Sequence, residues 1–287
     1  MVKRARRRTP AIGAEDVSVI VTTYDWPEAL YLVLSALDRQ SVRGFEVVVA
    51  DDGSGAPTRK LIDGFRPHRF DLRHIWQTDE GFRAARCRNL AVAAARGTYL
   101  VFIDGDCLPR EDFVERHMRL SRPGRMQRGN RVLLGRAYTE NLIGTGQIDE
   151  LMNPVSWPRL RVEGSIGRIL PLLQLPLGPV RRLRTKDWRG VKTSNLGIHR
   201  SDFHAVNGFD ETFRGWGHED ADLAIRLLRD GVRRCEATFA TTVFHLWHPE
   251  ADRTRELENA RRLAASRSGP IFCAEGLSSH LTNGSMR

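Results

Sequence analysis

Short runs of β-branched and other apolar residues alternate with helical patterns through the first hundred residues, and no other feature constrains the fold as strongly. The apolar runs occupy residues 17–22, 46–50 and 99–103, a further strand is predicted at residues 71–76, and the helical patterns lie between these strands. Continuous apolar runs are typical of strands buried on both faces, and strands alternating with helices form βαβ crossovers. The sequence therefore predicts an α/β fold, with a mostly parallel central sheet and helices on both faces.

Polar and acidic residues stand where three of the predicted strands end. Thr22 and Tyr24 close the first run, Asp52 follows the second, and Asp104-Gly105-Asp106 follows the fourth. Ligands of open α/β sheets bind beyond the carboxyl ends of the strands. We therefore expect these side chains to converge on one edge of the sheet.

The two carboxylates of Asp104-Gly105-Asp106 can hold a hard divalent cation, which would bridge the oxygens of a diphosphate. The alternative is an acidic surface turn, but the preceding apolar strand and the companion clusters favour a metal site. For Asp52 both interpretations stay open: it belongs to a plain turn, or its carboxylate accepts hydrogen bonds from a base or ribose.

The composition points to anionic partners and a reducing setting. Formal net charge is +10 and the calculated pI is about 10.2, a balance that favours nucleic acid, anionic lipid or phosphorylated glycan. The four cysteines form no C-x-x-C pair, which argues against a thiolate zinc site and a disulfide framework. The basic start at residues 1–8 is not followed by the apolar stretch of a secretory signal. We expect a cytoplasmic protein.

Three arginines, among them Arg83 and Arg88, surround the predicted start of the helix at residues 81–96. Arginine side chains and the free N–H groups of a helix start both suit phosphate. A solvated basic helix face is the alternative, and we expect it to account for at least one of the three.

The segment at residues 213–223 combines a glycine-flanked tryptophan with acidic residues at a predicted helix start. The indole of Trp216 would be costly to expose unless it stacks on a ligand such as a sugar ring. Glu219 and Asp220 could simply complement the helix dipole. Beside a stacked sugar, one of these carboxylates could instead act as general base on an acceptor hydroxyl, and we favour this second interpretation.

Two histidines, His245 and His248, lie at the end of a strand predicted at residues 241–246. Residues three apart on a strand point to opposite faces. We therefore expect at most one of them to ligate a metal, with His245 preferred and His248 as the alternative.

The segment at residues 168–184 is rich in leucine, proline and arginine. It could cover the core as a loop. It could also dock on a membrane, with leucines inserted and arginines at anionic head groups.

Five motifs in order resemble a family-2 glycosyltransferase of the GT-A, Rossmann-like fold. They are VSVIVTTYD, VVVADDGS, GFRAARCRN, YLVFIDGDC and FRGWGHEDADLAIRL, and the resemblance covers residues 17–249. The later part is similar to the galactosyltransferase-type segment of bacterial chondroitin-polymerase-like enzymes. The chain departs from the family's commoner Gly-Gly-Glu-Asp at His218 and from its usual asparagine at Asp25.

The resemblance implies an inverting enzyme that uses a nucleotide sugar, usually a UDP-sugar, with Mn²⁺ or Mg²⁺. It assigns Asp220 as catalytic base with Glu219 in support, and Trp216 to the acceptor. The remaining roles go to the nucleotide-sugar residues Thr22, Tyr24, Asp52, Arg83, Arg88 and Asp104, and to the metal residues Asp104, Asp106, His245 and His248.

We therefore predict transfer of a sugar to a hydroxyl of a glycan or glycolipid acceptor, in lipopolysaccharide or other surface polysaccharide synthesis, with peripheral association at an anionic membrane. The predicted organisation is a basic arm at residues 1–16, a GT-A domain at 17–250 and a C-terminal helix and tail at 251–287. Within the domain, residues 17–140 would bind the nucleotide sugar and residues 190–250 the acceptor.

Two alternatives are a sugar nucleotidyltransferase and a basic nucleic-acid-binding protein. The first would carry a glycine-rich phosphate loop after the first strand, and residues 23–27 lack one. Acidic strand ends would repel nucleic acid, so we expect no nucleic-acid partner.

Overall fold

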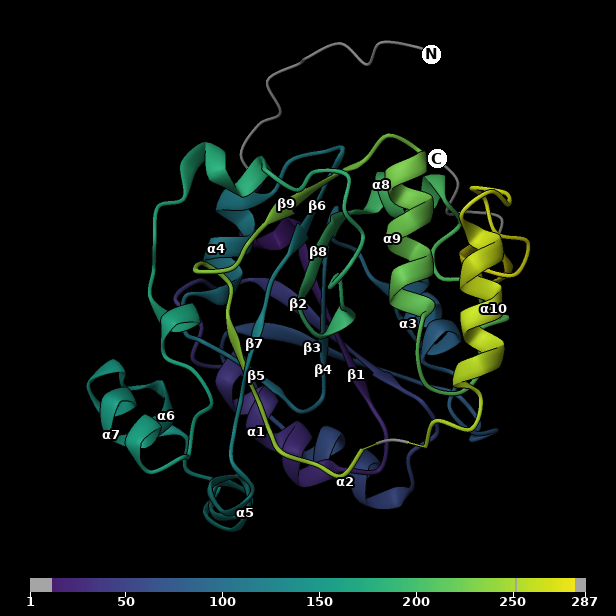
Figure 1. Ribbon diagram of the computed structural model, residues 1–287. Helices are drawn as coiled ribbons and strands as arrows, with labels where there is room; N and C mark the ends of the chain where they lie inside the picture. Colours follow the sequence, from purple (N-terminus) through teal and green to yellow (C-terminus); the bar gives the residue numbers. More distant parts are fainter. Residues whose placement is uncertain (1–11, 251, 282–287) are drawn as a thin grey trace.

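The computed structural model describes residues 12–250 and 252–281 and shows an α/β fold around a seven-stranded sheet (Figure 1). The arginine-rich start of the predicted basic arm and the last residues of the predicted tail lie outside the described residues. The strand order is β3-β2-β1-β4-β8-β6-β9. In chain order these strands are β1 (Val17–Thr23), β2 (Phe45–Asp51), β3 (Phe70–Trp76), β4 (Tyr99–Asp104), β6 (Arg125–Arg128), β8 (Leu196–His199) and β9 (Arg233–Glu236).

The four strands predicted over residues 17–103 all form, and they pair in parallel as β3-β2-β1-β4. β8 runs antiparallel between β4 and β6, so the sheet is mixed in its second half. A smaller three-stranded sheet has the order β5 (Cys107–Pro109), β10 (Val243–His245) and β7 (Arg131–Leu133). The predicted α/β class with a mostly parallel central sheet is confirmed.

Helices cover both faces of the large sheet, because each central strand is apolar on both sides. β1 buries Val17, Val19 and Val21 in one core cluster and Ile20 in the other. Full burial of such a side chain contributes about 1.5–3 kcal/mol. The helices are α1 (Pro27–Leu37), α2 (Ala56–Gly64), α3 (Ala84–Ala94), α4 (Phe113–Leu120), α5 (Arg136–Thr145), α6 (Asp149–Met152), α7 (Trp157–Val162), α8 (Arg200–Ala205), α9 (Glu219–Arg229) and α10 (Glu256–Ser266).

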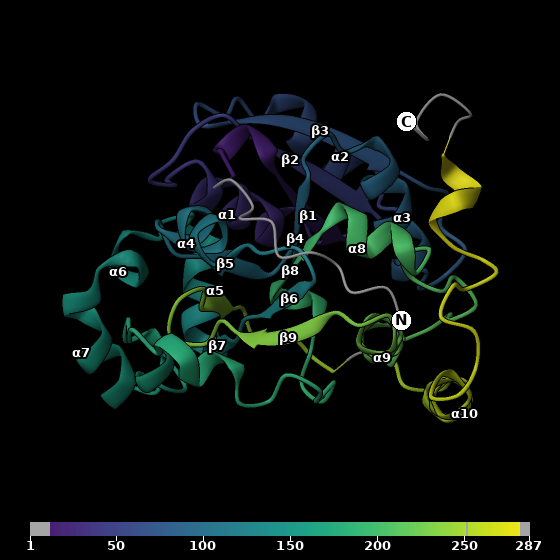
Figure 2. The same cartoon turned by 90° about the horizontal axis from the view of Figure 1, so that it is seen from above.

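The two core clusters assign the helices to the two faces. α1, α2 and α4 contribute buried residues to the cluster on one face, together with the small sheet. α3, α8 and α9 contribute to the cluster on the other face. In both views α10 lies beyond α9 at one side of the molecule, whereas α5, α6 and α7 lie at the opposite side (Figures 1 and 2).

Parallel pairing aligns the strand ends that carry the predicted site. Thr22 pairs with Asp104, and Thr23 pairs with Asp51 beside Asp52. The turn after β4 then passes close to β1, and the Gly105 N–H donates to the Thr22 carbonyl at 2.7 Å. A Cβ on Gly105 would lie 3.0 Å from that carbonyl oxygen, so this close approach favours glycine.

The small sheet brings the second half of the chain to the same edge. β5 begins directly after Asp106, and His245 on β10 pairs with Cys107 on β5. The backbone N–H of Leu246 also donates to the Asp106 carbonyl at 2.9 Å. His245 is therefore held beside Asp106.

The strand that begins at Arg131 is short. β7 ends at Leu133, and Tyr138 already lies in α5. The chain turns at Gly135, whose N–H donates to the Ser165 carbonyl, and α5 then buries Thr139 and Leu142. The end of β7 is therefore fixed by a contact between residues thirty positions apart, which a local sequence pattern does not reveal. Among the described residues, no helix is long and apolar enough to span a membrane.

Candidate active site

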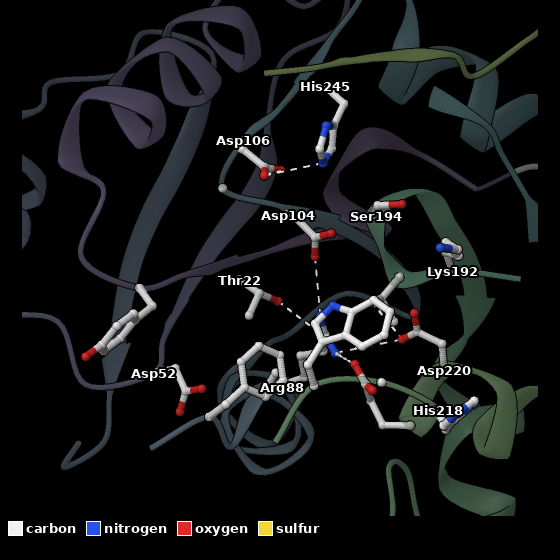
Figure 3. A pocket seen from close by; sticks show the side chains of 18 of the residues that line it. Thr22, Asp52, Arg88, Asp104, Asp106, Lys192, Ser194, His218, Asp220 and His245 are labelled. Carbon is white, nitrogen blue, oxygen red and sulfur yellow. Dashed lines mark hydrogen bonds and ion pairs between the residues drawn. The ribbon is translucent and has the colours of Figure 1, made fainter. Parts of the chain in front are cut away.

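A cavity of about 600 Å³ opens where the strand ends and the small sheet meet (Figure 3). Of the twelve residues predicted for the site, all except Arg83 line it. These eleven are Thr22, Tyr24, Asp52, Arg88, Asp104, Asp106, Trp216, Glu219, Asp220, His245 and His248. The convergence expected from the strand ends is therefore confirmed, and it extends to residues more than two hundred positions along the chain.

The prediction that Arg83 reaches the same ligand is not supported by its geometry. Its guanidinium pairs with Glu80 at 2.7 Å and donates to the Thr78 carbonyl, in a neighbouring groove. Only its backbone N–H points toward the site, donating to Asp52 at 2.8 Å. α3 begins at Ala84 rather than residue 81, so Arg83 precedes the helix and its side chain leaves in another direction.

Asp106, His245 and His248 form the metal-ligand cluster of the cavity. Their ligand atoms all lie within 4.8 Å of one another. One carboxylate oxygen of Asp106 is 3.4 Å from His245 Nε2 and 3.2 Å from His248 Nε2. Oxygen and imidazole nitrogen donors at this spacing can hold a divalent transition-metal ion. Asp104 and Cys107 also lie within 4.8 Å of Asp106, so Asp104 can approach the same ion.

Both histidines lie beside Asp106, although we expected residues three apart on a strand to point to opposite faces. That expectation assumed that the chain stays extended through His248, but β10 ends at His245. Leu246 is fully buried, and the chain then turns so that His248 returns to the same side. The two imidazole centroids are 5.1 Å apart.

The charges of the cluster suit cation binding. Burial lowers the pKa of His245 to about 4, so its imidazole is neutral near pH 7 and keeps a free lone pair. Burial by itself would raise the pKa of Asp106, but the hydrogen bond that His248 donates holds it below its usual value. Asp106 is therefore ionised.

Arg88 on α3 connects the metal-ligand cluster to the acidic start of α9. Its guanidinium lies 3.3 Å from Asp104, 3.0 Å from Glu219 and 3.8 Å from Asp220 (Figure 3). Its Nε also donates to the Thr22 hydroxyl at 3.0 Å. The Arg88 side chain is nearly fully buried. Its positive charge is tolerated there because three carboxylates surround it. Arg88 is thus committed to protein carboxylates, whereas the sequence suggested donor phosphates or ribose.

Glu219 and Asp220 differ in their exposure to the cavity. Glu219 is buried against Arg88, and this burial, together with the charge of Asp220, raises the pKa of Glu219 to about 7. The Asp220 side chain is more exposed, and its Oδ1 accepts a hydrogen bond from the Thr193 hydroxyl at 2.8 Å. Among the described residues, Asp220 Oδ2 has no hydrogen-bond donor, which leaves it able to accept a proton.

A strained turn presents Trp216 and the acidic pair. His218 caps α9 with a left-handed φ of +77°, a conformation that costs a non-glycine residue about 1–2 kcal/mol. The guanidinium of Arg253 lies over the Trp216 indole, with its Cζ 4.7 Å from the ring centroid. The backbone carbonyl of Trp216 accepts a hydrogen bond from the Asn259 side chain. A glycine at position 218 would avoid this strain, whereas His218 adds an imidazole to the cavity wall.

Asp52 lies across the cavity from Asp220 (Figure 3). Its carboxylate accepts from the Arg83 N–H and from the Gln77 side-chain amide. Burial raises the pKa of Asp52 in spite of these donors. Tyr24 stands at the rim, about half exposed, and its hydroxyl donates to Asp79 at 3.1 Å.

Several cavity residues were missed from the sequence because they lie between the motifs that carry the resemblance. They are Trp26, Arg131, Trp188, Lys192, Thr193 and Ser194. Figure 3 shows Lys192 and Ser194 on the same side as Asp220. Within residues 12–250 and 252–281, neither Arg131 nor Lys192 forms an ion pair. The Trp188-Arg189-Gly190 sequence is the one signal that could have indicated a half-buried tryptophan near a turn.

Two sequence families match this chain, one in its first half and one in its second half, and both matched segments contribute residues to the cavity. Residues 18–126 match "Glycosyl transferase family 2", and residues 184–249 match "N-terminal domain of galactosyltransferase". Neither match supports the nucleotidyltransferase or nucleic-acid-binding alternatives.

Two similar curated proteins are longer than this chain. Validoxylamine A glucosyltransferase of Streptomyces hygroscopicus subsp. jinggangensis is 29% identical over 75% of the chain and 52% of its own length. Chondroitin synthase of Escherichia coli is 27% identical over 76% of the chain and 33% of its own length. The chain therefore spans about half or less of these relatives.

Solved structures support the fold. S. aureus TarS 1–349 in complex with UDP superposes with a TM-score of 0.57 at 14% identity, covering 92% of this chain and 68% of that one. Mannosyltransferase PcManGT from Pyrobaculum calidifontis, in complex with GDP-Man and Mn²⁺, superposes with a TM-score of 0.52 at 19% identity. The match covers 87% of this chain and 61% of that one. The predicted GT-A fold is confirmed, and the chain is similar to glycosyl transferase family 2 over residues 18–126 and to the N-terminal domain of galactosyltransferase over residues 184–249.

Proposed function

We propose that this chain is an inverting, metal-dependent glycosyltransferase that moves a sugar from a nucleotide sugar, with UDP as the preferred nucleotide, to a hydroxyl of a glycan acceptor. The observation that carries the proposal is the gathering of eleven predicted residues around one cavity. Residues 17–140 would supply most of the donor site. Residues 190–250 would supply the acceptor site together with the two metal-binding histidines.

Asp106, His245 and His248 would hold the cation, with Asp104 beside them. Such a cation, when bound, neutralises charge on the departing diphosphate. Two imidazole nitrogens suit Mn²⁺ better than Mg²⁺, which prefers oxygen ligands throughout. A protein of similar fold, PcManGT, was solved with Mn²⁺.

Asp220 would act as general base. Its Oδ1 is held by Thr193 while Oδ2 is free to accept the proton of an acceptor hydroxyl, which then attacks the anomeric carbon from the side opposite the diphosphate. Trp216 would offer a flat apolar face to the acceptor sugar. Glu219, held by Arg88, would keep the start of α9 in place and support the acceptor.

Thr22, Tyr24 and Asp52 would line the nucleoside pocket and position the donor. UDP is favoured by the resemblance and by the similar fold of a UDP complex, TarS. Because PcManGT was solved with GDP-Man, GDP-sugars belong in any test.

The acceptor would be a glycan or glycolipid of a surface polysaccharide such as lipopolysaccharide, reached in part by peripheral association with an anionic membrane. The net charge of +10 supports an anionic acceptor or surface. Chondroitin synthase, a similar protein, is named for a polymer of this charge class.

The test is a donor screen with purified protein and Mn²⁺, in which UDP-, GDP- and dTDP-sugars are scored by donor hydrolysis and by thermal shift. We expect UDP with Mn²⁺ to raise the melting temperature and a UDP-sugar to be hydrolysed. Asp106→Ala should abolish both responses, and Asp63→Ala on the exposed side of α2 is the matched control. A wild-type protein that responds to no nucleotide would contradict the proposal.

A further inference from the structure

We propose that one side of the molecule docks on an anionic lipid membrane through residues 155–184. The docking surface consists of exposed valines and leucines interspersed with exposed arginines. Its members are Val155, Arg161, Val162, Arg168, Leu170, Leu173, Leu175, Val180, Arg182, Leu183 and Arg184. It includes the leucine- and arginine-rich segment seen in the sequence and extends it through α7.

Exposed apolar side chains are concentrated here. Of the fifteen large hydrophobic residues that are exposed in the described part of the chain, seven lie in this stretch, which is about a tenth of the sequence. Val162 is 89% exposed, Val155 84% and Leu183 78%. The other eight are scattered from Tyr24 to Phe272. Scattered apolar residues need no explanation, but their concentration within residues 155–184 indicates a partner.

The surface is held in place by the core beneath it, so its leucines cannot simply fold inward. Ile166 and Leu172 are fully buried and anchor the segment. Arg110 donates to the Leu172 carbonyl at 2.6 Å, and Arg181 donates to the Glu236 carbonyl at 2.8 Å. Between these anchors the short 3-10 turns η3 (Leu170–Leu172) and η4 (Gly178–Arg182) turn the intervening side chains to solvent.

The charge of the surface identifies the partner as anionic. Residues 155–184 contain six arginines and one glutamate, a net charge of +5. Arg159 pairs with that glutamate, Glu163. The arginines at 161, 168, 182 and 184 are exposed and make no ion pair within residues 12–250 and 252–281. Apolar side chains flanked by unpaired arginines match an acyl boundary covered by anionic head groups.

Other occupants fit less well. A second copy of this chain would bring two surfaces of net charge +5 together, which costs electrostatic energy. Nucleic acid would satisfy the arginines but leaves seven valines and leucines in water. The membrane satisfies both kinds of side chain.

The surface is continuous with the cavity along the chain. It lies on the side of the molecule opposite α10 (Figures 1 and 2). Five residues after Leu183, the same segment reaches Trp188, which lines the cavity, followed by Lys192 and Thr193. An acceptor carried on a lipid would then meet the cavity from the docked side, a consequence that rests on the proposed function, whereas docking itself does not.

The experiment is co-sedimentation of the full chain with vesicles of phosphatidylcholine alone, or of phosphatidylcholine mixed with phosphatidylglycerol, at low and high salt. We expect binding to the mixed vesicles that weakens with salt. Arg182→Gln with Arg184→Gln should weaken partitioning by roughly 30-fold, at about 1 kcal/mol for each arginine. Leu170→Ser with Leu183→Ser should weaken it at both salt concentrations.

Leu257→Ser is the matched control, because this leucine is 77% exposed on α10 and lies outside the surface. All the substituted side chains are exposed, so melting temperatures and UDP binding should stay unchanged and show that the variants fold. Equal binding to both vesicle types would overturn the anionic partner. The proposed docking surface would be wrong if both double variants bound vesicles as well as the wild type does. It would also be wrong if the wild type were a dimer that these substitutions dissociate.

Discussion

Two acidic clusters share one cavity, and their different neighbours give them different chemistry. Asp104 and Asp106 lie beside two histidines, one of them neutral, and form a site open to a cation. In the second cluster, Arg88 donates to one oxygen of Glu219, and the Thr193 hydroxyl donates to one oxygen of Asp220. We therefore propose metal binding for one pair of carboxylates and proton transfer for the other.

Arg88 makes the two clusters interdependent. It lies between Asp104 and Glu219, within hydrogen-bonding distance of both. Burial raises the pKa of Asp104 to about 6 and that of Glu219 to about 7, while Arg88 opposes both shifts. The separation of roles therefore depends on which partner each carboxylate has, and substitutions can test it.

The largest expected effect separates the clusters by kinetics. Asp220→Asn should lower kcat about 1000-fold, because the proton acceptor is lost, while donor affinity is retained. Asp106→Asn should instead abolish Mn²⁺-dependent UDP binding. Titration calorimetry with UDP and steady-state rates measure the two. Equal loss of donor affinity in both variants would show that the clusters do not have separate roles.

A smaller effect concerns the two histidines. His245→Gln and His248→Gln should each lower Mn²⁺ affinity by at least about 10-fold, because both imidazoles lie beside Asp106. His218→Gln is the control, since His218 lines the same cavity but lies outside the metal-ligand cluster. Unchanged affinity in His248→Gln would reinstate the expectation of a single histidine ligand.

The raised pKa of Glu219 predicts a loss of stability as pH rises. A carboxyl group whose folded pKa is about 7, against an ordinary 4.5, stabilises the fold fully below pH 4.5, and this contribution is lost as pH rises through 7. Between pH 5 and pH 8 the wild type should lose roughly 2 kcal/mol more unfolding free energy than Glu219→Gln. Urea unfolding at both pH values measures this. Identical pH dependence of the two proteins would contradict the buried environment of Glu219.

The smallest effect concerns how Asp220 is oriented. Thr193→Val removes the hydroxyl that holds Oδ1 and should lower kcat about 10-fold, since a hydrogen bond to a charged group contributes about 1.5–3 kcal/mol. Thr193→Ser keeps the hydroxyl and should restore most of the rate. Donor KM should not change in either variant. A serine variant as slow as the valine variant would indicate a packing role instead.

The predictable part of the site follows from the parallel strands. Apolar runs located β1, β2 and β4, and parallel pairing then required that Thr22, Asp52 and Asp104 share an edge. The misplaced residues lie at the ends of helices and strands. Arg83 was misplaced because a helix began three residues late, and His248 was misplaced because the chain turns after β10 ends at His245 instead of staying extended. Boundaries of one turn or less decide where such side chains point.

The sequence by itself determined the α/β class and the strand-end residues of the cavity, because these depend on local periodicity and on rules that hold for every parallel sheet, and the family resemblance implied the other predicted residues of the cavity. Only the tertiary structure decided that both histidines face Asp106, that Arg88 joins the two acidic clusters, and that Thr193 holds Asp220. Each of these contacts joins residues 16 to 142 positions apart along the chain. Their geometry depends on how the whole core packs, which no short stretch of sequence contains.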